Sequence, residues 1–232
     1  MKSPIILALD TQDISTAQSW IAATRSSIDT YKVGLEFFLK FGAQGVAALR
    51  EAGDFDLFLD LKLHDIPNTV AAAVSSVVDI APKFLTVHAG GGSAMVEAAA
   101  QAGPDISITA VTILTSLSEP EVSEIGFAAG ALESSLAMAS FASARGARSI
   151  VSSPFEVAAI RGSVGAEIEL ITPGVRPVGA SLGDQKRVMT PPEAIAAGAN
   201  YLVIGRPISG KWQEGSEAMN RAAAEILASI YG

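Results

Sequence analysis

Residues 57–64 have the sequence Leu-Phe-Leu-Asp-Leu-Lys-Leu-His, in which every second residue is a leucine. Successive side chains of a β-strand point to opposite faces, so this stretch predicts a strand with one leucine face. The other face carries Phe58, Asp60, Lys62 and His64. We expect helices to cover the leucine face. The face with the charged residues then points to the other side of the sheet, away from those helices. Its two full charges lie near the carboxyl end of the strand.

Similar apolar segments recur along the chain, each followed by an alanine-rich stretch with helical spacing. We expect eight strands, at residues 5–10, 31–35, 57–64, 84–89, 106–114, 149–152, 168–172 and 201–204. The expected helices are 15–28, 43–51, 67–80, 93–101, 132–144, 154–161, 191–197 and 216–230, with an extra one around 119–126. Strands this apolar, joined by helices, indicate an α/β protein with a parallel sheet. Eight such units in one domain of residues 1–232 predict a (β/α)8 TIM barrel, and a doubly wound open sheet is the alternative.

The composition describes a folded chain with no tendency to bind nucleic acid or to cross a membrane. Hydrophobic residues make up 49% and charged residues 17% of the chain, which is too apolar for disorder. The 24 acidic and 16 basic residues give a net charge of −8, so we expect no nucleic-acid partner. No run free of charged residues is long enough to span a bilayer as a helix.

The numbers of cysteines and histidines also predict that the protein holds no metal and lies in a reducing compartment. The chain has no cysteine and two histidines, so neither a disulfide nor a zinc site is expected. Its first residues, Met-Lys-Ser-Pro, lead into a short apolar segment that lacks the pattern of a signal peptide. We therefore expect a cytoplasmic protein without a bound metal.

Charged residues at the carboxyl ends of predicted strands indicate an active site, because barrel enzymes build their sites at that rim. Asp60 and Lys62 could form a purely structural ion pair, but burying two charges often costs more than their attraction returns. We therefore favour a catalytic function for this pair. Lys32 interrupts the apolar strand at 31–35, and its alternative explanation is an edge lysine that blocks aggregation. That alternative weakens in a barrel, which has no free edge.

Two aspartates near strand ends have a helix-capping alternative. Asp10 closes the first strand, and either a catalytic or a capping function fits its position. Asp65 has the opposite strand parity to Lys62 and precedes Pro67 by two residues. Its spacing alone therefore predicts that it caps the next helix.

The segments after the last two strands predict a phosphate site. Residues 204–207 have the sequence Ile-Gly-Arg-Pro, which brings a backbone amide at Gly205, the guanidinium of Arg206 and a proline suited to begin a short helix. TIM barrels bind phosphate after strands seven and eight. Arg176 follows the seventh strand, and the segment after it contains Gln185 and two glycines. That segment either closes over a ligand as a lid or is a surface loop.

The stretch that begins at Asp60 resembles the signature of a known enzyme family. Residues 60–69 have the sequence Asp-Leu-Lys-Leu-His-Asp-Ile-Pro-Asn-Thr, and the orotidine 5'-monophosphate decarboxylase family carries Asp-x-Lys-x-x-Asp followed by Pro-Asn-Thr. Further motifs follow in the family's order: Leu-Asp at 9–10, Lys-Val-Gly at 32–34, Val-Thr-Ile-Leu-Thr-Ser at 111–116, Thr-Pro-Gly-Val-Arg at 172–176, Gly-Asp-Gln at 183–185 and Ile-Gly-Arg-Pro at 204–207. The resemblance runs from the first strand to the last and is closest to the short, single-domain bacterial form.

This resemblance implies a (β/α)8 homodimer that converts orotidine 5'-monophosphate to uridine 5'-monophosphate and CO2 in de novo pyrimidine biosynthesis, without metal or organic cofactor. It makes Lys62 the proton donor to C6 of the pyrimidine and places Asp60 beside the leaving carboxylate. It also implies that Lys32 completes the charge array and touches the ribose, and that Asp10 binds the ribose hydroxyls.

The resemblance further implies that the substrate is held by both subunits. Asp65 and Thr69 are expected to enter the partner subunit's site, which makes dimerisation part of catalysis. The other expected substrate-binding residues are Ile66, Thr115, Arg176, Gln185, Gly205 and Arg206. Among these, Thr115 is the expected pyrimidine contact and Gln185 the lid residue that bridges base and phosphate. Arg176, Gly205 and Arg206 are expected at the phosphate end.

Three other functions fit parts of the same pattern. A ketogulonate-phosphate decarboxylase or hexulose-phosphate synthase shares the barrel and the Asp-x-Lys-x-x-Asp strand but uses Mg²⁺. A Schiff-base aldolase would use Lys62 as its nucleophile. A catalytically silent phosphate-binding or nucleotide-binding barrel is the alternative outside the enzymes. The sequence from His64 to Thr69 and the Gly-Asp-Gln motif favour the decarboxylase over the Mg²⁺-dependent relatives, and the presence of Lys32, Asp60, Lys62 and Asp65 argues against a silent barrel. Trapping with borohydride and a carbonyl substrate would reveal the aldolase.

Overall fold

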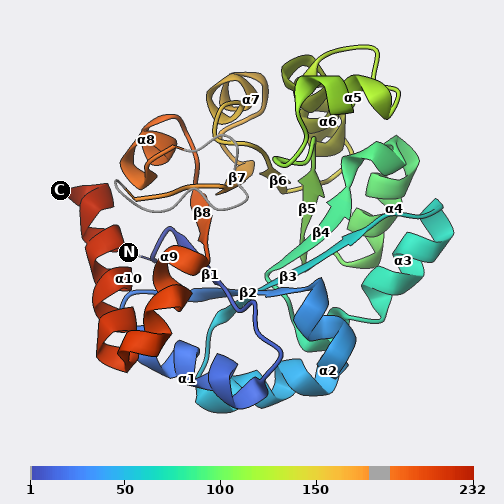
Figure 1. Cartoon of the computed structure of the whole chain (residues 1–232). Helices are drawn as coiled ribbons and strands as arrows, with labels where there is room; N and C mark the ends of the chain where they lie inside the picture. The colour runs from blue at the N-terminus through green and yellow to red at the C-terminus, as the bar shows by residue number, and fades with distance from the viewer. Residues whose placement is uncertain (1, 178–188) are drawn as a thin grey trace.

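The computed structural model describes residues 2–177 and 189–232, and its strands form one closed barrel with helices on the outside (Figure 1). The strands are β1 (Ile5–Ala8), β2 (Thr30–Gly34), β3 (Asp56–Leu63), β4 (Phe84–His88), β5 (Ser107–Val111), β6 (Ser149–Val151), β7 (Glu169–Pro173) and β8 (Tyr201–Ile204). Each pairs in parallel with the next, and β1 pairs with β8. The predicted TIM barrel is confirmed, and the open sheet is wrong because the β1–β8 pairing leaves no edge.

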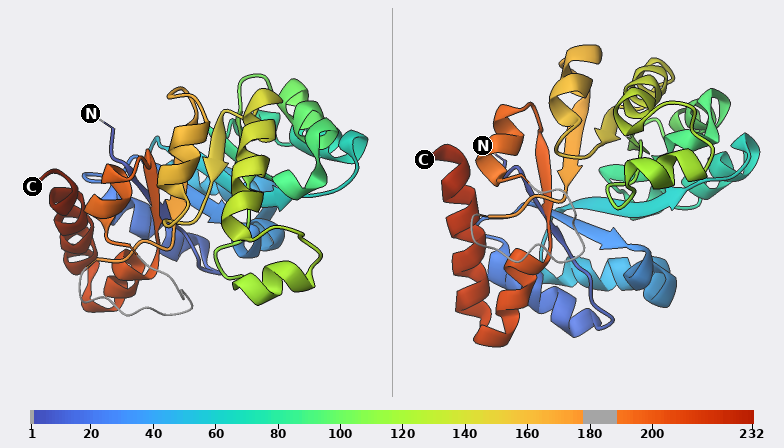
Figure 2. Two further views of the ribbon diagram at one scale, coloured as in Figure 1. Left: turned by 90° about the horizontal axis from the view of Figure 1, so that it is seen from above. Right: turned by 45° about the horizontal axis from the view of Figure 1, so that its top comes forward.

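Helices follow the strands around the barrel. They are α1 (Ile14–Thr24), α2 (Leu35–Leu49), α3 (Pro67–Ser75), α4 (Ser93–Ala102), α5 (Glu119–Glu124), α6 (Ala131–Ala144), α7 (Val157–Ser163), α8 (Pro191–Ala196), α9 (Arg206–Ser209) and α10 (Ser216–Tyr231). Short 3₁₀ turns lie at Arg50–Ala52, Val78–Ile80, Ala89–Gly91 and Gly210–Glu214. The view from above and the tilted view both show α10 running along one flank of the barrel beside α9 (Figure 2). In the described residues no helix has the length and apolarity needed to cross a membrane.

The largest departure from the predicted helices is at α2. We expected a helix over 43–51, but α2 begins at Leu35 and is interrupted at Gly42, whose φ of 58° and ψ of −156° are not helical. The expected helix is therefore only the second half of a longer element. Phe37 and Phe41 pack ring against ring in its first half, with centroids 4.9 Å apart. This contact with the core, rather than local periodicity, extends the helix back to the end of β2.

Two apolar clusters hold the barrel together. The larger lies between strands and helices and contains the outward residues of β3, Leu57 and Leu59, which are 0% exposed. The smaller fills the barrel interior with Ile6, Phe58, Phe84 and Ile171. Residues of one strand therefore divide between the two clusters by alternation, as the sequence of β3 predicts. The interior cluster also forms a solid floor beneath the carboxyl ends of the strands.

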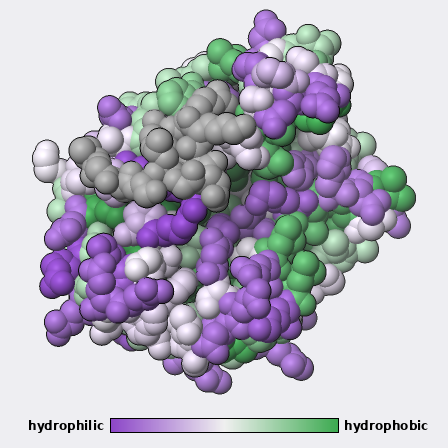
Figure 3. Space-filling view, viewed as in Figure 1, coloured by the Kyte–Doolittle hydropathy of each residue, from purple (hydrophilic) through white to green (hydrophobic). Residues whose placement is uncertain are grey.

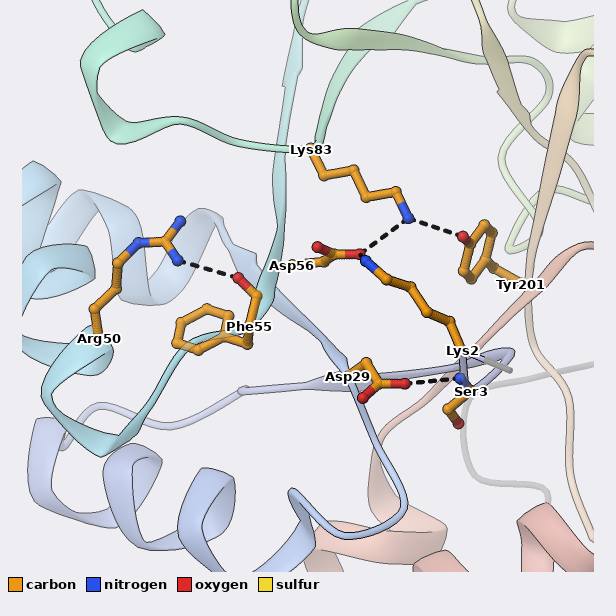
Figure 4. A network of polar contacts seen from close by, with 8 residues as sticks. All are labelled: Lys2, Ser3, Asp29, Arg50, Phe55, Asp56, Lys83 and Tyr201. Carbon is orange, nitrogen blue, oxygen red and sulfur yellow. Dashed lines mark hydrogen bonds and ion pairs between the residues drawn. The ribbon is translucent and has the colours of Figure 1, made fainter.

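A polar network closes the amino-terminal end of the barrel (Figure 4). The ammonium of Lys83 donates to Asp56 at 3.0 Å and to the Tyr201 hydroxyl at 2.9 Å, and Lys2 reaches the same Asp56 oxygen at 2.8 Å. Burial alone would lower the pKa of Lys83, but the bonds to Tyr201 and Asp56 raise it above its usual value. The network joins the starts of β3, β4 and β8. A role in stability fits this end of a barrel, because active sites lie at the other.

Candidate active site

A pocket opens inside the barrel where the strands end. It is lined by Lys32, Phe58, Asp60, Lys62, Val111, Ile113, Leu114, Thr115, Val151, Pro173 and Val203. Three of the charged residues singled out in the sequence thus meet in one cavity, together with Thr115. In the space-filling view, hydrophilic side chains gather near the middle of the face shown, with smaller apolar patches around them (Figure 3). The pocket has apolar walls and a charged end, which suits a small molecule that carries both apolar and polar groups.

The charged end is a chain of four side chains joined by ion pairs. Lys32 Nζ lies 3.4 Å from Asp10 Oδ1 and 3.4 Å from Asp60 Oδ2, and Lys62 Nζ lies 2.7 Å from Asp60 Oδ1. Asp60 therefore stands between two ammoniums, one on each carboxylate oxygen. The side chains of Asp60 and Lys32, in the middle of the series, are 11% and 12% exposed, whereas those of Asp10 and Lys62 at its ends are 63% and 32% exposed.

The surroundings of Asp60 keep it ionised. Burial raises the pKa of this carboxyl, but the charges of Lys32 and Lys62 and hydrogen bonds from Lys62 and Thr86 outweigh burial, and the pKa lies below its usual value. Two ammoniums and two carboxylates are close to neutral together, and this balance permits full charges in a nearly buried place.

Gly34 allows Lys32 to reach this chain. A Cβ atom built on Gly34 would lie 3.0 Å from Lys32 Nζ and 3.7 Å from Asp10 Oδ1. Any other residue would therefore push against the ion pair that the ammonium makes with Asp10. The structure thus gives a steric reason for glycine at the last position of the Lys-Val-Gly motif at 32–34, because the Lys32 ammonium lies close to Gly34.

An irregularity in the backbone of β3, and not simple strand alternation, sets the direction of the Lys62 side chain. Leu59 pairs with Leu85 and Leu63 with Val87, so four residue steps on β3 lie opposite two on β4. Lys62 adopts a left-handed φ of 49°, which is uncommon for residues other than glycine and costs about 1–3 kcal/mol. The predicted inward face is therefore correct for Phe58, Asp60 and Lys62, which all line the pocket, but Lys62 reaches it from an irregular backbone and His64 is not part of the lining. Such bulges are common next to active sites, where they redirect a side chain.

The segment after β3 faces solvent. Residues 64–69 are all exposed, and Ile66 has 65% of its surface accessible although it is apolar. In the described residues Asp65 makes no ion pair, and its carboxylate accepts the backbone N–H of Ile66 at 2.6 Å. The capping prediction for Asp65 is wrong, because Ile66 is the N-cap of α3 and no side chain caps that helix. The carboxylate of Asp65 is thus left available at the surface, as is the Thr69 side chain.

The expected phosphate residues lie on the opposite side of the pocket, after β7 and β8. α9 begins at Arg206 with Gly205 as its N-cap and Pro207 in its first turn, which confirms the predicted short helix. Arg206 is exposed, whereas Arg176 is 8% exposed and donates from Nη1 to the Val175 carbonyl at 2.9 Å. Gln185 lies outside the described residues.

The contacts that two residues of β4 make at the site were not predicted from the sequence. Thr86 of β4 is 0% exposed and hydrogen-bonds to both Asp60 and the Lys62 backbone. His88, at the end of β4, stacks on His64 with ring centroids 5.4 Å apart. Burial, followed by the charges of His64 and Lys62, lowers the pKa of His88. The alternation of β4 gives Thr86 and His88 the same face, but it cannot show which residue of β3 lies opposite them.

No set of three or more histidine, aspartate or glutamate side chains is placed to hold a metal ion in residues 2–177 and 189–232. The site therefore consists of fixed ammoniums and carboxylates over an apolar wall. Such an arrangement can stabilise a developing negative charge and deliver a proton to it.

Comparison with known proteins gives a consistent result. The family described as "Orotidine 5'-phosphate decarboxylase / HUMPS family" matches residues 3–221. The chain is 51% identical over 223 residues to a Thermobifida fusca protein named orotidine 5'-phosphate decarboxylase, covering 96% of both, and 42% identical over 239 residues to one from Frankia casuarinae, covering 96% of this chain and 87% of that protein. A crystal structure of orotidine 5'-phosphate decarboxylase from Lactobacillus acidophilus superposes with a TM-score of 0.84 at 29% identity, covering 100% of both chains.

Proposed function

This chain belongs to the orotidine 5'-phosphate decarboxylase / HUMPS family, and from that membership we propose that it converts orotidine 5'-monophosphate to uridine 5'-monophosphate and CO2 in pyrimidine biosynthesis. The observation that carries the proposal is the Lys62 ammonium, held 2.7 Å from Asp60 inside the barrel pocket. The reaction needs neither metal nor organic cofactor. The whole chain acts as one barrel domain in the cytoplasm, a compartment that suits a chain without cysteine.

The chemistry explains why a fixed ammonium is needed. Loss of CO2 from C6 leaves an electron pair in the plane of the pyrimidine ring, where the ring's π system cannot delocalise it. Stabilisation must therefore come mainly from charge placed beside C6 before the bond breaks. Lys62 supplies that charge and then gives a proton to C6, so that the C–C bond is replaced by a C–H bond and CO2 departs.

The other charged residues hold this ammonium and bind the sugar. Asp60 pairs with the Lys62 ammonium and lies beside the leaving carboxylate, where repulsion between like charges also raises the energy of the bound substrate. Lys32 completes the array and contacts the ribose, and Asp10, the most exposed of the four, binds the ribose hydroxyls. Thr115, which lines the pocket, contacts the pyrimidine.

Binding of the phosphate takes place far from the reacting bond. We assign it to Gly205, Arg206 and Arg176, with Gln185 bridging base and phosphate. The energy of this remote interaction can be used to organise the charges around C6, so its loss lowers the rate as well as the affinity. The N-cap position of Gly205 in α9 and the guanidinium of Arg206 support this assignment.

The exposed segment after β3 supports a homodimer with shared sites. Asp65 makes no ion pair within the described residues, and Ile66 exposes 65% of an apolar surface at the same rim as the pocket. We propose that a second subunit covers this segment, and that Asp65, Ile66 and Thr69 complete the partner subunit's site. Asp65 then adds the second carboxylate next to Lys62 of the partner.

The first test is the ultraviolet absorbance change when the purified protein meets orotidine 5'-monophosphate, with and without EDTA. Turnover insensitive to EDTA and abolished in Lys62→Ala supports both the reaction and the proton donor. Lys83→Ala is the matched control, because Lys83 also pairs with an aspartate at about the same distance but at the other end of the barrel. Loss of turnover with EDTA would move the proposal to a Mg²⁺-dependent sugar-phosphate member of the family.

A second test addresses the shared site. Lys62→Ala and Asp65→Ala subunits are each expected to be inactive as homodimers. Mixing and reassociating them should restore activity, because each heterodimer contains one site with both wild-type residues and one site with neither. No recovery, with heterodimers demonstrated by mass, would show that Asp65 acts within its own subunit.

A further inference from the structure

Thr86 occupies the point where the registers of β3 and β4 separate. Its neighbours Leu85 and Val87 pair with Leu59 and Leu63 of β3. Thr86 therefore lies opposite the three β3 residues between Leu59 and Leu63. Its side chain is 0% exposed. A buried hydroxyl requires partners, and here both partners belong to the charged array.

The hydroxyl of Thr86 ties the two ends of Lys62 to one carboxylate. It accepts the backbone N–H of Lys62 at 2.8 Å and donates to Asp60 Oδ1 at 3.0 Å. The same Oδ1 atom accepts the Lys62 ammonium at 2.7 Å. Thr86, Asp60 and Lys62 therefore form a closed ring of hydrogen bonds that passes through the whole Lys62 side chain.

The proton of this hydroxyl can point in only one useful direction. The Lys62 amide occupies one lone pair of the oxygen, and the single hydroxyl proton is left for Asp60. The bond to the amide is available because Lys62 leaves the regular ladder with its left-handed φ of 49°. Without an acceptor at Thr86, that N–H would lose its partner in a part-buried place, and the bulge would lose the bond that compensates its strain.

We propose that Thr86 is a positioning residue for the decarboxylation: it holds the bulged backbone of Lys62 and the carboxylate of Asp60 in the relative arrangement that aims the ammonium at the substrate. Thr86 does not touch the substrate, and it is absent from the lining of the pocket. The inference rests on the proposed function, because it assigns Thr86 a part in the same proton delivery.

Thr109 provides a matched control within the barrel. It pairs directly with Thr86 across the β4–β5 ladder and is also 0% exposed. Its hydroxyl contacts Ser149 Oγ at 2.6 Å and the Ser107 carbonyl at 3.1 Å, and these partners lie outside the charged array. Replacing either threonine by valine removes a buried hydroxyl at nearly constant volume, but only one replacement breaks the ring around Lys62.

The experiment compares Thr86→Val, Thr86→Ser and Thr109→Val by steady-state kinetics with orotidine 5'-monophosphate, with thermal unfolding measured on each. We expect kcat of Thr86→Val to fall at least about tenfold with KM within about threefold, because a hydrogen bond to a charged group is lost. Thr86→Ser keeps the hydroxyl and should stay within about threefold of wild type. The acid limb of kcat against pH should also move upward in Thr86→Val, because Asp60 loses a bond that lowers its pKa.

The outcomes separate this inference from the function on which it rests. An inactive wild-type protein would overturn the proposed function. An active wild type with unchanged kcat and pH profile in Thr86→Val would overturn the positioning role alone. Equal losses in Thr86→Val and Thr109→Val would also overturn it, since a general effect of deleting a buried hydroxyl would then suffice. If Thr86→Val does not fold, Thr86→Ala removes the same hydroxyl without adding a methyl group, and the same kinetic comparison decides.

Discussion

Replacing Asp60 by asparagine tests whether the charged array stabilises the fold or strains it. Asn keeps the size of the side chain and one oxygen acceptor but removes the negative charge that lies 2.7 Å from Lys62 and 3.4 Å from Lys32. Both ammoniums then lose their shared counter-charge. Lys32 is the more affected, since its side chain is 12% exposed and, within the described residues, the ion pair with Asp10 is the one that it retains.

The size of the effect follows from these distances. At an effective dielectric constant of about 20, each of the two attractions is worth roughly 5–6 kcal/mol before the cost of desolvation. Removing one member of a buried ion pair costs about 3–5 kcal/mol net. Lys62 is 32% exposed and partly screened, so we expect the free energy of unfolding to fall by about 2–3 kcal/mol at pH 7. In a chain of this length that corresponds to a Tm lower by about 4–12 °C.

The pKa of Asp60 predicts how the stability difference between wild type and Asp60→Asn changes with pH. The pKa of Asp60 is lower in the folded protein than the ordinary value of 3.8. Its contribution to stability is therefore present above 3.8 and lost as the pH falls through the folded pKa. The Tm difference between wild type and Asp60→Asn should be full at pH 7 and should shrink below about pH 4.

The assay is thermal unfolding followed by circular dichroism at one protein concentration, at pH 7 and at several acid values. Asp10→Asn is the control, because Asp10 pairs with Lys32 at 3.4 Å but is 63% exposed, and its loss should cost less than about 1 kcal/mol. An Asp60→Asn protein as stable as wild type at pH 7, or more stable, would refute the reasoning. Desolvation of the carboxylate would then exceed the attraction of both lysines, as it does when an active site is built at the expense of stability.

Three further predictions concern other parts of the molecule. Lys83→Met should lower the free energy of unfolding by about 1 kcal/mol in urea titration, because Asp56 and Tyr201 lose their shared donor, while kcat/KM stays unchanged. His88 should titrate below its ordinary pKa of 6.5 in a proton NMR titration, and His64→Ala should raise that midpoint because one neighbouring positive charge is removed. Arg206→Ala should reduce kcat/KM for orotidine 5'-monophosphate by more than about threefold, and a smaller change would exclude it from phosphate binding.

The secondary structure and the class of fold could be predicted from local sequence. Strand and helix signals depend on the spacing of apolar residues within about ten positions, and all eight strand segments lie where that spacing places them. The ends of several elements were set by packing instead. α2 begins at Leu35 because its first half finds a place on the core, which a local pattern cannot show.

For the candidate site too, the sequence predicted some features and only the tertiary structure determined others. The sequence by itself selected Asp60 and Lys62 near the carboxyl end of an apolar strand, Lys32 as a lysine that interrupts one, and Asp10 as an acid that closes one. Only the tertiary structure decided that Asp60 stands between the two lysines, that Lys62 leaves the strand with a left-handed backbone, and that Thr86 holds both. These features arise from the register between neighbouring strands. Register depends on contacts between residues distant in the chain, so it is decided by how the barrel closes and packs and cannot be inferred from the alternation within one strand.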